Sequence, residues 1–106
     1  MDTRSSLFIA IASQSGAIVS RLLTLHADVN EPRAGTLPSE RPLHCAVRVG
    51  NLDTLQILLE GRADVSMVDH EGNTALHIAT WRGIPTHIEG LLLAGADQDH
   101  LSGTMN

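Results

Sequence analysis

The sequence predicts an all-α solenoid of stacked helix-turn-helix units with protruding β-turn fingers. Two observations lead to this fold class. The string LHCA at residues 43–46 recurs as LHIA at residues 76–79, 33 residues later. The match continues beyond the string, because Gly50 corresponds to Gly83 and the pair Ala-Asp at 63–64 corresponds to the same pair at 96–97. A fixed period of about 33 residues with this core is typical of a repeat unit made of a β-turn and two helices.

Each unit is expected to supply two short antiparallel helices. We place them at residues 6–13 and 16–25 in the first unit, 42–49 and 52–60 in the second, and 75–82 and 85–94 in the third. Pro42 suits the first position of a helix, where its missing N–H costs nothing. Gly50 suits the end of that helix, and Thr74 is the natural N-cap of the equivalent helix one unit later.

The motifs identify a family resemblance. Residues 69–79, DHEGNTALHIA, resemble the ankyrin repeat signature D-x-x-G-x-T-P-L-H-x-A, and residues 91–97, LLLAGAD, resemble the end of that family's second helix. The resemblance implies one domain over residues 1–106. It contains a degenerate repeat 1 at about 1–33, repeat 2 at about 34–68, repeat 3 at about 69–101, and at 102–106 the start of an absent fourth unit. The resemblance is specific for the fold but not for a partner, because one scaffold serves many functions.

Several departures from the repeat pattern predict marginal stability. Three extra residues fall between the first two repeats, in a loop at residues 31–41 that contains Pro and Gly. Arg41 replaces the capping Thr of the second repeat. His26 and Arg62 stand where this family usually has a glycine with positive φ, and Gly90 interrupts the last helix.

The end of the chain predicts an uncovered face. Residues 97–106 resemble the start of a fourth turn, but no fourth pair of helices follows. We therefore expect Leu92 or Leu93 to lack a cover, although terminal repeats usually carry a polar outer face. This face could support self-association through an uncapped C-terminal repeat.

The composition of the chain indicates a cellular compartment and disfavours some classes of partner. The net charge of −5 disfavours nucleic acid and anionic membranes as partners. A single cysteine excludes an internal disulfide and favours an intracellular location, in the cytoplasm or the nucleus. Residues 7–12 are apolar, but this run is too short for a secretory signal and fits the first helix of a repeat.

No residue pattern indicates catalysis, a cofactor or a metal site. His44 and His77 occupy the same repeat position, where the family resemblance implies hydrogen bonding around the preceding turn; Thr74 is the expected partner of His77. The remaining histidines lack zinc-like spacing and are expected in turns and on the surface: His26, His70, His87 and His100. Cys45 aligns with Ile9 and Ile78, which predicts a core position, and neighbouring helical residues such as His44 and Cys45 do not face each other.

Trp81 is the strongest candidate for a binding residue. The resemblance places Trp81 and Arg82 on the concave groove, with Arg48 and Val49 as their equivalents one repeat earlier. The turn residues His70, Glu71 and Asn73 are expected to overhang the same groove. Trp and Arg dominate binding hot spots, so we expect these seven residues to form a partner-binding surface. The alternative is that Trp81 packs onto a neighbouring helix and fills space.

The sequence therefore favours a non-enzymatic module, a scaffold that binds a protein partner. One alternative is a fragment of a larger protein whose activity lies elsewhere; the missing cap favours this alternative and the initial Met1 opposes it. A remote alternative is a small enzyme that uses His44 and Cys45, which the repeat phase opposes because it assigns both residues to structural positions.

Overall fold

The chain folds into six helices in the computed structural model, which describes residues 3–31, 40–69 and 71–102, with the backbone alone at 3–5 and 96–102. The helices are α1 (Thr3–Ala12), α2 (Gly16–Thr24), α3 (Pro42–Val49), α4 (Leu52–Glu60), α5 (Ala75–Arg82) and α6 (Pro85–Ser102). No strand occurs in the described part of the chain. The predicted all-α class is therefore confirmed.

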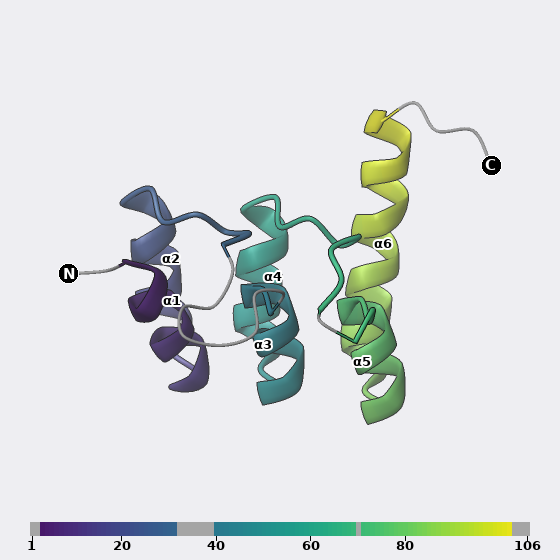
Figure 1. The fold of residues 1–106 in the computed structure, drawn as a ribbon, viewed down its shortest axis with the longest axis horizontal. Helices are drawn as coiled ribbons and strands as arrows, with labels where there is room; N and C mark the ends of the chain where they lie inside the picture. The colour runs from purple at the N-terminus through teal and green to yellow at the C-terminus, as the bar shows by residue number, and fades with distance from the viewer. Residues whose placement is uncertain (1–2, 32–39, 70, 103–106) are drawn as a thin grey trace.

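The helices stack as three pairs in two layers (Figure 1). Each unit contributes one pair, in which α1 packs on α2, α3 on α4, and α5 on α6. Neighbouring units then pack like on like, so that α1, α3 and α5 form one layer and α2, α4 and α6 form the other. This arrangement is the predicted solenoid of three helix pairs.

Local sequence fixes the helix ends of the second and third units. The bounds of α3, α4 and α5 agree with the prediction. Asn51 caps α4 by accepting a hydrogen bond from the backbone N–H of Thr54, and Thr74 caps α5 in the same way through His77 N. Gly50 and Gly83 end α3 and α5 with φ of 85° and 66°, a left-handed conformation that glycine adopts without a steric cost. Arg41 stands at the N-cap position of α3, and its side chain, as expected, makes no capping hydrogen bond.

Two helix boundaries differ from the prediction by more than one residue. Helix α1 begins at Thr3 rather than residue 6, and α6 continues through Gly95 to Ser102 rather than ending at residue 94. The segment from Asp97 to Ser102 is therefore helical and is not the start of a fourth turn. The segment at 103–106, which completes that prediction, lies outside the described residues.

The ends of α2 and α6 differ in their contacts with a following unit. The loop after α2 is held by the second unit, since Asn30 Oδ1 accepts from the N–H of Asp64 at 2.8 Å and Arg41 Nη1 donates to Asn30 O at 3.2 Å. Within the described residues no further unit follows α6 to hold a loop in this way. A single glycine inside a helix costs only about 1 kcal/mol, so Gly95 alone does not stop α6.

Among the residues that the structure describes, three other than glycine adopt positive φ. His26 and Arg62 have φ of 73° and 70°, which confirms the strained turn sites predicted from the repeat pattern. Gln14, with φ of 59°, is a third site that the analysis missed. The repeat phase could have identified it, because Gln14 stands where the later units carry Gly50 and Gly83. The predicted loop at residues 32–39 lies outside the described residues.

The core lies between the units, and the residues at its positions are less buried in the third unit than in the second. Leu43, Val47 and Leu55 are each at most 3% exposed because the next unit covers them. Their equivalents in the third unit are less protected: Leu76 and Ile88 are half-buried and Thr80 is exposed. Leu92 and Leu93 are 53% and 70% exposed, so the predicted uncovered outer face is confirmed at both positions.

Candidate functional site

The turn finger between α4 and α5 is built around Asp69. The N–H of Gly72 donates to Asp69 O at 2.9 Å, which closes a β-turn, and Gly72 has φ of 81°. One carboxylate oxygen of Asp69 accepts the N–H groups of Glu71 and Asn73, each at 2.9 Å. Asp69 is 7% exposed, whereas the side chain of Glu71 is exposed. A buried carboxylate therefore shapes a finger whose tip faces solvent.

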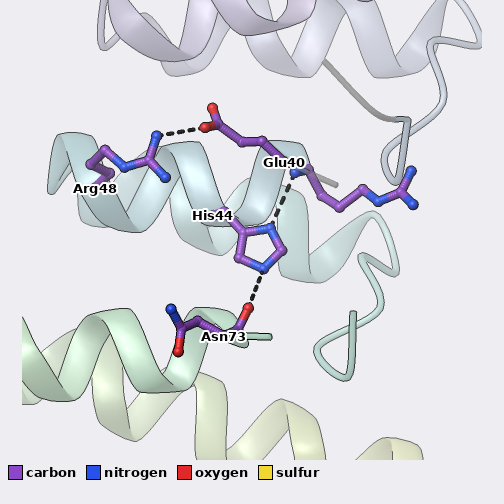
Figure 2. A network of polar contacts seen from close by, with 5 residues as sticks. Glu40, His44, Arg48 and Asn73 are labelled. Carbon is purple, nitrogen blue, oxygen red and sulfur yellow. Dashed lines mark hydrogen bonds and ion pairs between the residues drawn. The ribbon is translucent and has the colours of Figure 1, made fainter. Parts of the chain in front are cut away.

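His44 joins this finger to the preceding unit. Its Nδ1 accepts the backbone N–H of Arg41 at 3.1 Å, and its Nε2 lies 3.1 Å from Met67 O. The same Nε2 lies 3.0 Å from Asn73 O (Figure 2). The side chain is 1% exposed. Burial lowers the pKa of His44, and this effect exceeds the opposing effects of its backbone partners and of Asp69. His44 is therefore structural, as the resemblance implied.

His77 repeats only half of this arrangement. Its Nδ1 accepts the backbone N–H of Thr74 at 3.0 Å and lies 3.0 Å from the Thr74 hydroxyl, which confirms the expected partner. The side chain of His77 is exposed, unlike that of His44. The difference follows from the position of the unit in the stack, because the described chain places no finger over His77.

Arg48 is held by an ion pair that the sequence analysis missed. Arg48 Nη1 donates to Glu40 Oε2 at 2.7 Å (Figure 2), with the two side chains 49% and 16% exposed. The hydrogen bond to Glu40 raises the pKa of Arg48. The repeat phase contained a signal for this pair, because Glu40 is the equivalent of Asn73 and Arg48 is the equivalent of Trp81.

Trp81 is the most exposed large apolar side chain in the described part of the chain, at 71%. The alternative in which Trp81 fills space inside the molecule is therefore wrong. Arg82 is also exposed, and its Nη2 lies 3.5 Å from where a Cβ at Gly50 would be, so the guanidinium reaches back over the end of α3. Val49 is half-buried, and His70 lies outside the described residues.

The structure thus places the predicted site residues on adjacent elements. Arg48 and Val49 end α3, Trp81 and Arg82 end the neighbouring helix α5, and Glu71 and Asn73 lie in the finger just before α5. The finger contacts α3 through the bond from His44 to Asn73.

The other candidate reactive groups have structural surroundings. Cys45 is 5% exposed and lies in the core, as predicted, and Ile78 at the same repeat position is 8% exposed. The core assignment of this position is wrong for the first unit, where Ile9 is 65% exposed. Among the described residues no group of three or more His, Cys, Asp or Glu side chains is placed to hold a metal ion. No helix in the same residues has both the length and the apolar composition to cross a membrane.

His87 corrects the prediction that four histidines lie in turns and on the surface. It is 1% exposed, in α6, and its Nδ1 has no hydrogen-bond partner in the described part of the chain. It occupies the repeat position of Thr54, which is also buried. Alignment of the repeats would therefore have predicted a buried side chain at His87. Burial, and then the charge of Arg82, lower the pKa of His87. His26 is exposed as predicted, and His100 lies in α6 rather than in a turn.

Comparison with known proteins identifies related chains. Residues 7–101 match a family model described as ankyrin repeats in 3 copies. The chain is 34% identical over 96 residues to the nuclear factor NF-kappa-B p105 subunit of Gallus gallus, covering 88% of this chain and 9% of that protein. It is 42% identical over 57 residues to protein phosphatase 1 regulatory subunit 27 of Homo sapiens, covering 54% and 37%.

A further relative shares a shorter segment. The chain is 53% identical over 38 residues to a putative palmitoyltransferase, ZDHHC13, of Danio rerio, and the match covers 36% of this chain and 6% of that protein. The chain therefore corresponds to 6%, 9% and 37% of the lengths of these three relatives.

Proposed function

This chain belongs to the ankyrin repeat family, and from that premise we propose that it is a non-enzymatic module that binds a protein partner through one extended surface. Ankyrin repeats are a protein–protein interaction module. The proposed surface is the concave groove with its overhanging turn finger. Its residues are Trp81, Arg82, Arg48, Val49, His70, Glu71 and Asn73.

The exposure of Trp81 is the observation that carries this proposal. In the second unit, the equivalent Arg48 is paired with Glu40 at the finger position. In the third unit the finger position is Asn73, which carries no charge, and Trp81 is 71% exposed. An exposed Trp offers a large rigid apolar surface with few rotatable bonds, and such side chains dominate binding energy when a partner covers them.

Arg82 supplies the polar part of the proposed surface. Its guanidinium is exposed, and no described residue forms an ion pair with it. A planar guanidinium can donate two parallel hydrogen bonds to a carboxylate. We therefore propose that the partner places an apolar side chain on Trp81 and a carboxylate near Arg82. The overall negative charge of the chain argues against nucleic acid or an anionic membrane in this role.

Two further aspects of the function are also proposals. The chain corresponds to small fractions of its relatives, so it could serve as the repeat segment of a larger protein with another activity. Self-association is a second candidate function, favoured by Leu92, which is 53% exposed although its equivalent Leu59 is half-buried. Sedimentation at increasing protein concentration tests self-association. An intracellular location, in the cytoplasm or nucleus, remains our expectation.

Tryptophan fluorescence tests the proposed site directly. The chain has one Trp and no Tyr, so its own emission comes from Trp81, and the emission of each partner measured alone is subtracted. Proteins captured on the immobilised chain are titrated individually against it while the emission is recorded. A partner that covers Trp81 shifts the emission to shorter wavelength at saturation. A saturating partner that leaves the emission unchanged places the contact elsewhere.

A further inference from the structure

We propose that His44 is a pH-sensitive latch that holds the turn finger at residues 67–73 against α3, and that acid releases the finger before the helices unfold. The latch consists of His44, the N–H of Arg41, and the carbonyl groups of Met67 and Asn73. The opening of the finger is argued from the hydrogen bonds of His44 and does not depend on the proposed function. Its consequence for partner binding rests on the proposed function, because Glu71 and Asn73 belong to the proposed surface.

The geometry fixes the protonation state of His44. Nε2 faces two carbonyl oxygens, at 3.1 and 3.0 Å, and a carbonyl only accepts hydrogen bonds, so Nε2 must carry the proton. Nδ1 accepts the N–H of Arg41 at 3.1 Å, so Nδ1 must be unprotonated. The ring is therefore the neutral tautomer with hydrogen on Nε2. This single form bonds both sides of the finger to the start of α3.

A second proton on His44 breaks this arrangement. The proton would occupy Nδ1, which would then present a hydrogen to the N–H of Arg41 in place of a lone pair. The charge would also lie on a side chain that is 1% exposed, and a buried charge without a direct ionic partner is costly. The simplest relief is for the ring to turn out towards water. This movement gives up the bonds to Met67 and Asn73, and the finger loses its attachment to α3.

The surrounding charges do not cancel the effect of burial. Glu40 and Asp69 both favour the protonated ring, but the desolvation of His44 outweighs them, and the pKa of His44 lies below its ordinary value of 6.5. The neighbouring cations are engaged elsewhere, since Arg41 Nη1 donates to Asn30 O and Arg48 Nη1 donates to Glu40.

The chain contains its own control for the latch. His77 occupies the same repeat position and accepts the N–H of Thr74 through Nδ1, as His44 accepts that of Arg41. The His77 ring is exposed, and among the described residues no carbonyl group bonds to its Nε2. The described hydrogen bonds of the His77 ring therefore lie within its own unit. Any effect specific to the latch must be absent at His77.

Amide hydrogen exchange measured by NMR tests the latch in the intact chain. The N–H groups of Asp69 and Gly72 are bonded within the finger, to Asn73 O and Asp69 O, and report its closure. The N–H of Leu55 in α4 reports the helices. After correction for intrinsic exchange, we expect finger protection to fall at least about tenfold between about pH 7.5 and about pH 5, below the ordinary pKa of His. Protection at Leu55 should fall much less. Equal changes at the two places, or an unchanged finger, would overturn the proposal.

Two variants assign the effect to His44. His44→Gln removes the titrating group, so finger protection should no longer change over this pH range. His77→Gln should keep the full change. If His44→Gln does not fold, a ring titration of the unmodified chain decides: the ¹⁵N shifts of His44 should report the tautomer with hydrogen on Nε2 and should change together with finger protection. A His44 ring that carries hydrogen on Nδ1 at neutral pH would contradict the latch.

Partner binding separates the latch from the proposed function. If the finger opens in acid and the affinity of a captured partner falls with it, both proposals are supported. If the finger opens and the affinity is unchanged, the latch stands and the finger does not belong to the binding surface. A finger that stays closed in acid overturns the latch whatever the affinity does.

Discussion

Cδ1 of Leu59 lies 3.8 Å from the position that a Cβ at Gly90 would occupy. Leu59 belongs to α4 and Gly90 to α6, so this ordinary van der Waals distance joins two neighbouring units. A methyl group at residue 90 would therefore make a contact without displacing a neighbour. The glycine weakens α6 without being required by the packing.

Gly90→Ala should stabilise the protein by about 1 kcal/mol, because alanine has the higher helix propensity and gains the contact with Leu59. The urea midpoint measures the change. Gly16→Ala is the matched control, because it also lies in a helix but its Cβ would meet Cδ1 of Ile57 at 3.0 Å. A Gly90→Ala midpoint at or below that of the unmodified chain would show that residue 90 has no free space.

Arg62→Gly should raise the free energy of unfolding by about 1 kcal/mol, because a side chain at positive φ is strained and glycine is not. Arg62 has φ of 70° and an exposed side chain, so little packing is lost. Arg62→Ala is the control, since it shortens the side chain but keeps the Cβ. Equal urea midpoints for the two variants would place the effect in the arginine side chain and not in the backbone.

His87→Leu should stabilise the protein more in acid than at neutral pH. Burial lowers the pKa of His87 in the folded chain, so the unfolded chain takes up a proton first as the pH falls through the ordinary value of 6.5. The free energy of unfolding then falls with pH, by up to about 1.4 kcal/mol per pH unit for one group. Leucine removes this loss.

Urea unfolding at about pH 7.5 and about pH 5, on either side of the ordinary pKa of His, measures the effect. The difference between His87→Leu and the unmodified chain should grow towards acid. A His87→Leu variant whose advantage does not depend on pH would show that His87 is not buried as a neutral ring.

The repeat pattern predicted the parts of the fold that depend on local sequence and on equivalent positions. Pro42, Gly50 and Thr74 mark helix ends by their own backbone and side-chain chemistry, so the bounds of α3 and α5 followed directly. The positive φ at His26 and Arg62 followed from the glycine expected at that position. The end of α6 could not be predicted in this way, because loops after the second helix are held by the next unit.

The candidate site was predictable only in part. The exposure of Trp81 could not follow from sequence, because the same helix position could pack on a neighbour or face solvent. The pair of Glu40 and Arg48 is eight residues apart and bridges a turn and the end of a helix, a geometry that no helical spacing indicates. His87 was misassigned because its histidine neighbours in sequence suggested a surface group, whereas burial follows its repeat position.

The binding affinity of Trp81→Ala, measured together with its thermal midpoint, tests the account most directly. The partner is one captured on the immobilised chain, and Leu93→Ala is the control, because Leu93 is 70% exposed and lies outside the proposed surface. We expect Trp81→Ala to weaken binding by at least about 2 kcal/mol, or roughly 30-fold, and to leave the thermal midpoint unchanged. Leu93→Ala should change neither. A Trp81→Ala variant that binds normally, or that loses binding only because its thermal midpoint has fallen, would contradict the claim that Trp81 is the centre of the binding surface.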